Sequence, residues 1–329
     1  MWKCFRHTMM VLVVAVVPTQ TRAQVTNKDA AYPVKPVRMV VMGLPGGTPD
    51  IQVRMLTEKI TPRLGQQVVV DNRAGANGNI AMGIVAKAPP DGYTLIIATT
   101  GTWALNPYLY DLPYDVLKDF APVIHIATTP AVLVVHPSLP VKSVKELIAL
   151  ALQKPGELNY GSAGVGGFGH VSAELFSLMT NTRMTHVPYK GAPPALTDLV
   201  GGQIQVLFNS ATFTIPQITA RRVRALATTG TARLPILPAL PTVAEAGVAG
   251  YDNSTWSAIA APAQTPQPII ARLNSEFAAA LQLPDIKERY AAAGSTVTGG
   301  TPEHFHSYLK AELAKFGRLV RETGIKTER

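Results

Sequence analysis

Residues 37–50 read Val-Arg-Met-Val-Val-Met-Gly-Leu-Pro-Gly-Gly-Thr-Pro-Asp, an apolar run that leads through a glycine pair into polar residues. The apolar run over 37–42 predicts a buried strand, and the glycine pair predicts a tight turn. Residues 50–64 after this turn are expected to form a helix, and Gly65 provides a C-terminal glycine stop. A strand, a glycine turn and a helix in this order predict one unit of an α/β fold.

Two later stretches have the same character. They are Thr99-Thr100-Gly101-Thr102 and Gly161-Ser162-Ala163-Gly164-Val165-Gly166-Gly167, each after a strand-like run. Turns of this kind leave backbone N–H groups without partners at a helix start, where the helix dipole favours an anion. The chain is therefore predicted to hold a small anion rather than to transform it.

The remaining chain alternates strand-like and helix-like segments. Expected strands cover 67–71, 95–99, 131–135, 159–162, 185–189, 206–209, 225–228 and 256–260, and expected helices cover 77–87, 143–152, 170–180 and 193–200 and begin at Pro266, Pro284 and Pro302. This alternation predicts an α/β fold with mainly parallel sheets flanked by helices.

Two such units without a flexible linker predict two lobes joined by crossing strands. One candidate crossing covers 122–136, interrupted at 128–130, and the other lies between 225 and 260. We expect lobe 1 to be discontinuous, with residues 32–125 plus 229–329, and lobe 2 to comprise residues 126–228. Ligands of open α/β sheets bind beyond the carboxyl ends of the strands, where the glycine turns fall.

The N-terminus has the pattern of a secretory signal. Lys3 and Arg6 precede an apolar run from Met9 to Val17, and Ala23 ends a small-residue cleavage pattern. We expect residues 1–23 to be a signal peptide, because the apolar run is too short to span a bilayer as an anchor.

Cys4 is the sole cysteine and would leave with the signal. The mature chain would then contain no thiol, which excludes disulfides, thiolate metal ligands and cysteine nucleophiles.

The charge balance is mildly basic. The 329-residue chain carries 30 basic and 21 acidic residues, and cleavage would remove three basic ones, leaving a net charge of +6. Most positive charges are scattered, so we expect an attraction for anionic ligands and no nucleic acid partner.

The stretch Gly164-Val165-Gly166-Gly167-Phe168-Gly169 matches the G-x-G-x-x-G dinucleotide pattern. It lies in mid-chain, and no acidic residue follows the next strand to bind a ribose. A bare anion nest fits better, with a purely structural glycine turn as the alternative. We expect no cofactor.

Enzyme and metal interpretations have weak support. Ser162 and His170 suggest a secreted serine hydrolase, although their spacing is poor for a nucleophile and its base, and no G-x-S-x-G elbow occurs. His304-Phe305-His306 places two rings on different sides of a helix, so no metal site is expected.

Several other residues are compatible with either a ligand-binding or a structural role. Asp50 would contact the ligand or complement the helix dipole, and Lys190 would bind a carboxylate or form a salt bridge. Trp103, Phe168 and Phe213 would form an apolar wall or belong to the core.

Short motifs along nearly the whole chain resemble the Bug family of periplasmic solute receptors of tripartite tricarboxylate transporters. The motifs are Pro45-Gly46-Gly47 with Asp50, residues 72–78, 90–94, 106–107, 113–115, 118–123, 160–164, 187–191, 201–203 and 241–247. The order of these motifs behind a signal peptide makes the resemblance specific.

The resemblance implies a two-lobed, type II-like periplasmic binding fold that closes on a small carboxylate. Backbone groups of the loops at 44–48 and 162–169 would grip the acid, and the loop at 99–103 would line the same cleft. The partner implied is the integral membrane permease of a tripartite tricarboxylate transporter, with a signalling pathway as the alternative. The receptor is expected to be a periplasmic, non-enzymatic monomer. The predicted site residues are Leu44, Gly46, Gly47, Thr48, Asp50, Thr100, Gly101, Thr102, Trp103, Ser162, Ala163, Gly166, Phe168, Gly169, His170, Lys190 and Asn209.

The chain departs from the family pattern at three positions. Gly43 replaces a usual aromatic residue, Trp103 replaces a common histidine, and Asn209 replaces a common aspartate. Loss of the acid at 209 disfavours a ligand with an amino group, and Trp103 favours an apolar or aromatic ligand body. The sequence therefore predicts a dicarboxylate or an aromatic acid as ligand.

Overall fold

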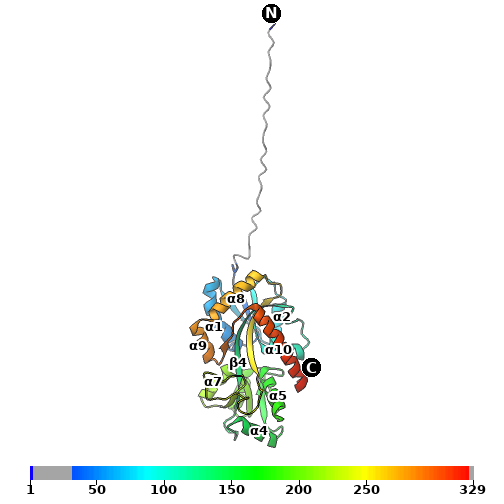
Figure 1. The fold of residues 1–329 in the computed structure, drawn as a ribbon, viewed down its shortest axis with the longest axis vertical. Helices are drawn as coiled ribbons and strands as arrows, with labels where there is room; N and C mark the ends of the chain where they lie inside the picture. Colours follow the sequence, from blue (N-terminus) through cyan, green and yellow to red (C-terminus); the bar gives the residue numbers. More distant parts are fainter. Residues whose placement is uncertain (3–31, 326–329) are drawn as a thin grey trace. The chain divides into compact units, whose positions relative to one another are not determined.

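A computed structural model describes residues 1–2 and 32–325 of the chain. The predicted signal peptide at 1–23 lies, apart from its first two residues, outside the described residues. Residues 33–329 form one compact unit, separate from residues 1–32, and residues 33–325 are its described part. Figure 1 shows this unit with its helices arranged around a central set of strands.

The first sheet has parallel strands at one edge and antiparallel strands where the chain crosses between lobes. β1 pairs in parallel with β2 and β3, and β9 pairs antiparallel with β3 and β4. Its strands, in spatial order, are β2 (Val68–Asn72), β1 (Val37–Val41), β3 (Thr94–Thr99), β9 (Ser254–Pro262), β4 (Phe120–Val135) and β10 (Thr296–Val297).

The second sheet is built in the same way. β5 pairs in parallel with β6 and β7, and β4 pairs antiparallel with β7 and β8. Its strands beyond β4 are β5 (Asn159–Ser162), β6 (Thr185–Pro188), β7 (Val206–Ser210) and β8 (Arg224–Thr228).

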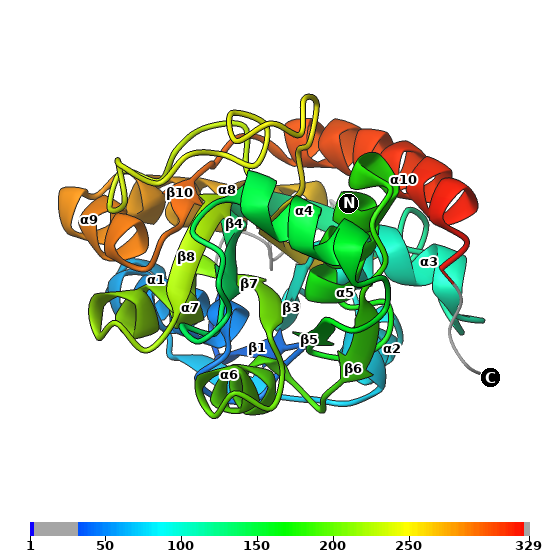
Figure 2. The same ribbon diagram turned by 90° about the horizontal axis from the view of Figure 1, so that it is seen from below.

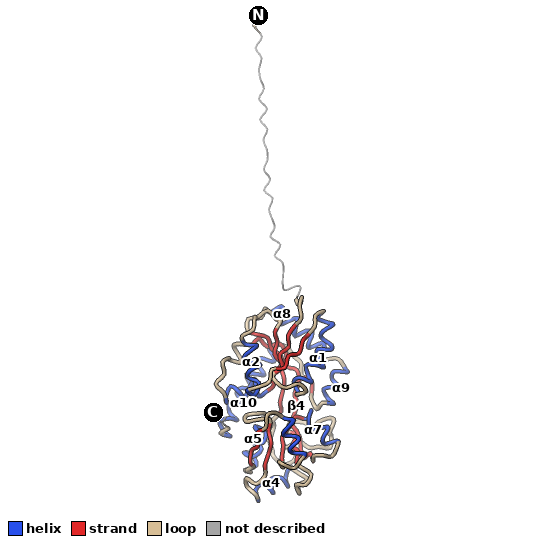
Figure 3. Tube along the Cα trace, turned by 180° about the vertical axis from the view of Figure 1, so that it is seen from behind, coloured by secondary structure: helices blue, strands red, loops and turns tan. Residues whose placement is uncertain are grey.

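β4 joins the two sheets. Its residues 120–130 pair with β9 in the first sheet, and its residues 131–135 pair with β7 and β8 in the second. The sequence predicted an interruption at 128–130, but the strand continues through these residues. Figure 3 shows strands running through the middle of both lobes, with helices outside them. The chain returns to the first sheet through residues 229–253, which lead into β9.

Helices cover both faces of each sheet. In the first lobe, α2 and α10 pack on the face that carries Val40 and Ile96, and α1 and α8 pack together. In the second lobe, α4 and α5 cover the face of Leu133, and α6 and α7 cover the face of Val132 (Figure 2). The helices are α1 (Thr48–Leu64), α2 (Asn79–Ala86), α3 (Asn106–Leu109), α4 (Val144–Gln153), α5 (Phe168–Thr180), α6 (Ala192–Val200), α7 (Ala211–Thr219), α8 (Gln267–Leu281), α9 (Pro284–Ala292) and α10 (Pro302–Thr323).

The structure confirms the predicted two-lobed α/β fold and every strand and helix expected from the pattern, within a few residues at the ends. The sequence missed α3, α7, β10 and the π-helical turn η3 (Gly101–Leu105), which continues directly into α3. Among the described residues, the helices lack the combination of length and apolar character that crossing a membrane requires.

Trp103 lies in the core of the first lobe. Its side chain is 0% exposed, and its ring packs edge-on against Phe120 at 5.2 Å and Phe305 at 5.8 Å. The Trp103 Nε1 atom has no hydrogen-bond partner among the described residues. The side chain therefore acts through packing.

We expect Trp103→Ala to lower the free energy of unfolding by about 3–5 kcal/mol, because it opens a cavity among packed rings. Trp103→Phe should cost less, since it keeps most ring contacts and removes the unpartnered Nε1 atom. Urea denaturation monitored by circular dichroism measures both. Equal losses for the two variants would contradict this account of the packing.

Candidate functional site

A cavity of about 820 Å³ lies between the lobes, lined by residues from both. The carboxyl ends of β1 and β3 supply its first-lobe wall, and the ends of β5 and β7 supply the second. This is the position expected for a ligand in an α/β fold.

The first glycine corner, residues 44–48, connects β1 to α1. Gly46 has a φ of 78°, in the left-handed region that favours glycine, and Gly47 caps the helix with φ −69° and ψ 159°. Leu44, Gly47 and Thr48 line the cavity. Pro49 has no N–H, so the N–H groups of Thr48 and Asp50 are the ones in the first turn of α1 without an acceptor in the helix, and they are available to an anion there.

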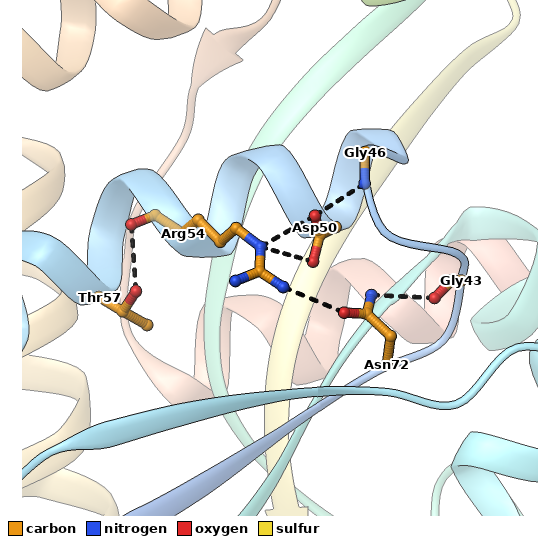
Figure 4. Close-up of polar contacts among 6 residues, drawn as sticks. All are labelled: Gly43, Gly46, Asp50, Arg54, Thr57 and Asn72. Carbon is orange, nitrogen blue, oxygen red and sulfur yellow. Dashed lines mark hydrogen bonds and ion pairs between the residues drawn. The ribbon is translucent and has the colours of Figure 1, made fainter.

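Asp50 holds this corner from behind. Its buried carboxylate accepts hydrogen bonds from Gly46 N–H at 2.8 Å and Arg54 Nε at 2.9 Å (Figure 4). Arg54 also donates to Asn72 Oδ1, and Asn72 Nδ2 donates to Gly43 O. Asp50 is absent from the cavity lining, so the network positions the loop.

The same network sets the pKa of Asp50. Burial opposes ionisation, but hydrogen bonds from Arg54, Gly46 and Asn72 and the charge of Arg54 outweigh it and hold the pKa below its ordinary value. Asp50 is therefore charged at neutral pH.

The second glycine corner, residues 164–168, connects β5 to α5. Gly166 has a φ of 71°, and Gly167 caps α5 with φ −70° and ψ 160°. Gly167, Phe168 and Gly169 line the cavity. Gly169 is closely packed, since a Cβ there would lie 2.5 Å from Phe208 O. A second helix start thus faces the cavity from the opposite lobe.

A third loop, residues 75–78, lines the cavity and was not among the predicted site residues. Four successive residues have positive φ, including Ala76 at 45° and Asn77 at 51°. Asn106 holds this strained loop by donating to Asn77 O at 3.1 Å and accepting from Asn77 Nδ2 at 2.9 Å. The Gly-Ala-Asn-Gly run, two residues after the end of β2, was the signal that could have revealed it.

The floor of the cavity is a buried polar cluster between the lobes. Gln52 donates to Thr129 Oγ1 and Ser295 Oγ, both at 3.3 Å, and accepts from Ser257 Oγ at 2.6 Å. Since Thr129 lies where β4 passes between sheets, this cluster ties α1 to the crossing strand.

The walls of the cavity combine apolar side chains with Lys190 and Asn209, two residues that carry hydrogen-bond donors. Phe168 and Phe213 are the aromatic wall residues of the second lobe, as the sequence suggested. Lys190 is exposed and, within residues 32–325, forms no ion pair. It is the one side chain of full charge among the described lining residues.

Asn209 is 7% exposed and lines the cavity. Its Oδ1 accepts from Ser210 N–H at 3.0 Å, which fixes the orientation of the amide. Its Nδ2 is buried with no acceptor in the described part of the chain. Asn209 thus lines the cavity and carries a buried amide donor that no described residue satisfies.

One hydrogen bond joins the two walls. Thr48 Oγ1 lies 3.2 Å from Ser210 Oγ, so the start of α1 touches the end of β7. Near the second corner, Tyr110 OH donates to Val165 O at 3.3 Å. The lobes are in contact around the cavity.

The predicted site residues fall into two groups. Those that line the cavity are Leu44, Gly47, Thr48, Gly101, Ala163, Phe168, Gly169, Lys190 and Asn209. Those that are absent from the lining are Gly46, Asp50, Thr100, Thr102, Trp103, Ser162, Gly166 and His170.

The expectation of a cleft-lining loop at 99–103 needs correction. Thr99 and Gly101 line the cavity, but Thr102 and Trp103 are buried within the π-helical turn. Thr100 Oγ1 accepts from Trp256 N–H at 2.7 Å, which fastens the turn to β9. The wider turn directs Trp103 into the core, so it supplies no aromatic surface to the cavity.

Ser162 and His170 do not form a nucleophile–base pair. Ser162 is 1% exposed, and its Oγ lies 2.7 Å from Nε2 of His186. His170 accepts from Gly166 N–H through Nδ1 at 2.9 Å. Among the described residues, no cluster of three histidine, cysteine or acidic side chains is arranged to hold a metal ion.

Two lobes around a shared cavity, with helix starts from both, define a solute-binding protein. Residues 52–325 match the family model described as tripartite tricarboxylate transporter family receptor, and the chain belongs to this family, TctC. Family members of the Bug type are similar to it across most of their length. The chain is a solute-binding receptor and not an enzyme.

Named relatives are similar over nearly the full chain. BugT from Bordetella pertussis is 37% identical, over 90% of this chain and 91% of that protein. R. palustris Rpa4515, solved with adipate, is 41% identical with a TM-score of 0.86, over 90% and 100% of the two chains. MatC from Rhodopseudomonas palustris, solved with malate, is 31% identical with a TM-score of 0.81, over 88% and 100%.

We expect Asp50→Asn to lower the free energy of unfolding at pH 7 by on the order of 1–2 kcal/mol, because a neutral amide at this position bonds Gly46 and Arg54 more weakly than the carboxylate does. The lowered pKa means that the stabilisation from Asp50 is complete above its ordinary value of 3.8 and is lost as pH falls through the native value. The difference from the wild type should therefore shrink below pH 4. Urea denaturation at pH 7, 5 and 3.5 measures it, with exposed Asp111→Asn as control. A difference that stays constant to pH 3.5 would contradict the assignment.

Proposed function

We propose that this receptor captures a small organic carboxylate in the interlobe cavity and delivers it to the membrane permease of a tripartite tricarboxylate transporter. The observation that carries the proposal is the convergence of two helix starts, those of α1 and α5, on one cavity. Each offers N–H groups and the positive end of a helix dipole to an acid group.

The electrostatics of the lining support an anionic ligand. Lys190 supplies a positive charge, and the described lining residues include no aspartate or glutamate. A cationic ligand would face two helix dipoles and a lysine without a compensating carboxylate. A carboxylate would gain charge-assisted hydrogen bonds instead.

Asn209 supports a ligand with an acceptor atom. Its Nδ2 is buried without a partner among the described residues, and such a donor is costly unless a ligand atom accepts its hydrogen. A carboxylate or carbonyl oxygen would satisfy it, whereas an ammonium group would not.

The shape of the site favours a dicarboxylate or an aromatic acid. Two corners on opposite lobes suit a molecule with an acid group at each end, and Phe168 and Phe213 offer apolar walls to its middle. The adipate-bound neighbour, 41% identical, supports the dicarboxylate. Trp103 no longer supports an aromatic ligand, because it lies in the core.

Binding would proceed by hinged closure. Lobe 1 would comprise residues 32–125 and 229–329 and lobe 2 residues 126–228, with β4 as the principal hinge. The hydrogen bond between Thr48 and Ser210 supports a closed arrangement of the lobes in the structure. A ligand that contacts both lobes shifts the equilibrium toward this state.

The receptor would act as a periplasmic monomer after removal of residues 1–23. The family description supports transport. The alternative role is that of a ligand sensor, in which closure of the two lobes would signal to a membrane partner. Uptake of labelled adipate in cells that carry or lack the receptor separates the two roles.

We expect adipate, malate or benzoate to raise the melting temperature of the purified receptor. At a ligand concentration 100 times Kd, the shift should be about 4 °C for a domain of this size. Adipamide, which lacks the charges, and the diamine cadaverine should give no shift. Stabilisation by cadaverine and by none of the acids would refute the carboxylate proposal.

We expect Asn209→Asp to weaken adipate binding at least tenfold at pH 7, because a carboxylate would replace the donor beside the bound acid. Asn209→Leu is the matched comparison, since it removes the donor without adding charge and should cost less. Isothermal titration calorimetry measures both. Wild-type affinity in Asn209→Asp would remove this side chain from the ligand site.

A further inference from the structure

The two glycine corners have the same backbone geometry, although they share little sequence. Gly46 and Gly166 have φ of 78° and 71°, and Gly47 and Gly167 have φ,ψ of −69°, 159° and −70°, 160°. In both, the N–H of the cap glycine donates to the carbonyl three residues earlier, at 3.1 and 3.0 Å. The same glycine corner thus occurs once in each lobe, before α1 and before α5.

Each corner is held by an acceptor at the same position in its helix. Gly46 N–H donates to Asp50 Oδ2 at 2.8 Å, and Gly166 N–H donates to His170 Nδ1 at 2.9 Å. Both acceptors lie four residues after the glycine, in the first turn of the helix. Neither acceptor is among the residues that line the cavity. His170 is therefore the structural counterpart of Asp50.

The two acceptors differ in chemistry. A carboxylate accepts whenever it is ionised, but an imidazole nitrogen accepts only while it carries no proton. The bond from Gly166 thus assigns the neutral form to His170, with the hydrogen on Nε2. That Nε2 lies 4.0 Å from Glu174 Oε1.

The surroundings of His170 favour the neutral ring. The side chain is 8% exposed, and its ring stacks on His186 with centroids 4.0 Å apart and planes 8° apart. The titratable groups near this pair are Tyr160 on β5 and Glu174 on α5. Tyr160 OH donates to Glu174, and His186 Nε2 lies 2.7 Å from Ser162 Oγ.

Burial lowers the pKa of His170 to about 4. Burial, followed by the charge of His170, lowers the pKa of His186 to about 4 despite the opposing charge of Glu174. Two stacked imidazoles resist simultaneous protonation, because like charges would lie about one ring separation apart. The bond from Gly166 to His170 is therefore intact across neutral pH.

We propose that His170 is a positioning residue for the ligand, whose unprotonated Nδ1 holds Gly166 and so sets the second glycine corner to face the cavity. The inference rests on the proposed function, because it assigns that corner to ligand binding. Protonation of His170 breaks the bond and releases the corner, while the first corner, held by Asp50, keeps its geometry.

Three variants test the role. His170→Asn keeps an acceptor, Oδ1, close to the position of Nδ1 but cannot be protonated in this range. His170→Phe keeps a ring for stacking but has no acceptor. His136→Asn removes a histidine at the end of β4, outside the site, and serves as the control.

At pH 7, His170→Phe should bind adipate about tenfold more weakly than the wild type, and His170→Asn and His136→Asn should stay within threefold. Isothermal titration calorimetry provides the values. Wild-type affinity in His170→Phe would overturn the proposal, and so would an equal loss in His170→Asn and His170→Phe.

A second measurement needs no ligand. In ¹⁵N–¹H spectra of the wild type, the Gly166 amide proton should move upfield together with the titration of the His170 ring, near pH 4. In His170→Asn the same amide should not titrate in that range, and in His136→Asn it should behave as in the wild type. If the chemical shift of the Gly166 amide proton in the wild type does not change as the His170 ring titrates, the proposed hydrogen bond is refuted. If neither the wild type nor any variant binds adipate, malate or benzoate, the carboxylate proposal fails, while the titration of the Gly166 amide still decides whether His170 holds the corner.

Discussion

The proposed ligand site depends on backbone N–H groups at two helix starts, which are held in place and have no acceptor within their own helices. Helix starts supply such groups, and the preceding residue must be fixed for them to point in a constant direction. In the first glycine corner, the Asp50 carboxylate fixes Gly46. Because Arg54 and Asn72 in turn hold Asp50 and Gly43, the direction of the N–H groups is set by a network outside the cavity.

The relation between the lobes follows from one strand. β4 belongs to the first sheet over 120–130 and to the second over 131–135, so both sheets are aligned on it. β1 and β5 end at the cavity, and each runs into a glycine corner. The polar cluster of Gln52, Thr129, Ser257 and Ser295 lies where the sheets meet. Continuity of a strand therefore brings distant turns of the sequence to one cavity.

Much of this architecture could be predicted from local sequence pattern. Alternating strands and helices and the glycine turns between them depend on neighbouring residues, and they were found within a few positions. Trp103 was misplaced because a π-helical turn changes the direction of its side chain, which no periodicity reveals. The unpartnered amide of Asn209 and the pairing of Ser162 with His186 depend on contacts between distant segments, so only the structure could show them.

Recognition by main-chain atoms has a consequence for how such receptors diversify. The glycine corners present the same chemical groups whatever residues flank them, as their two occurrences in this chain demonstrate. In the proposed mode of binding, the distance between the two corners selects ligands by length, and wall residues such as Phe213 and Asn209 select them by chemical type. If the corners bind the acid group as proposed, a receptor can evolve toward a new ligand through changes at a few wall positions, while the main-chain groups that bind the acid stay the same.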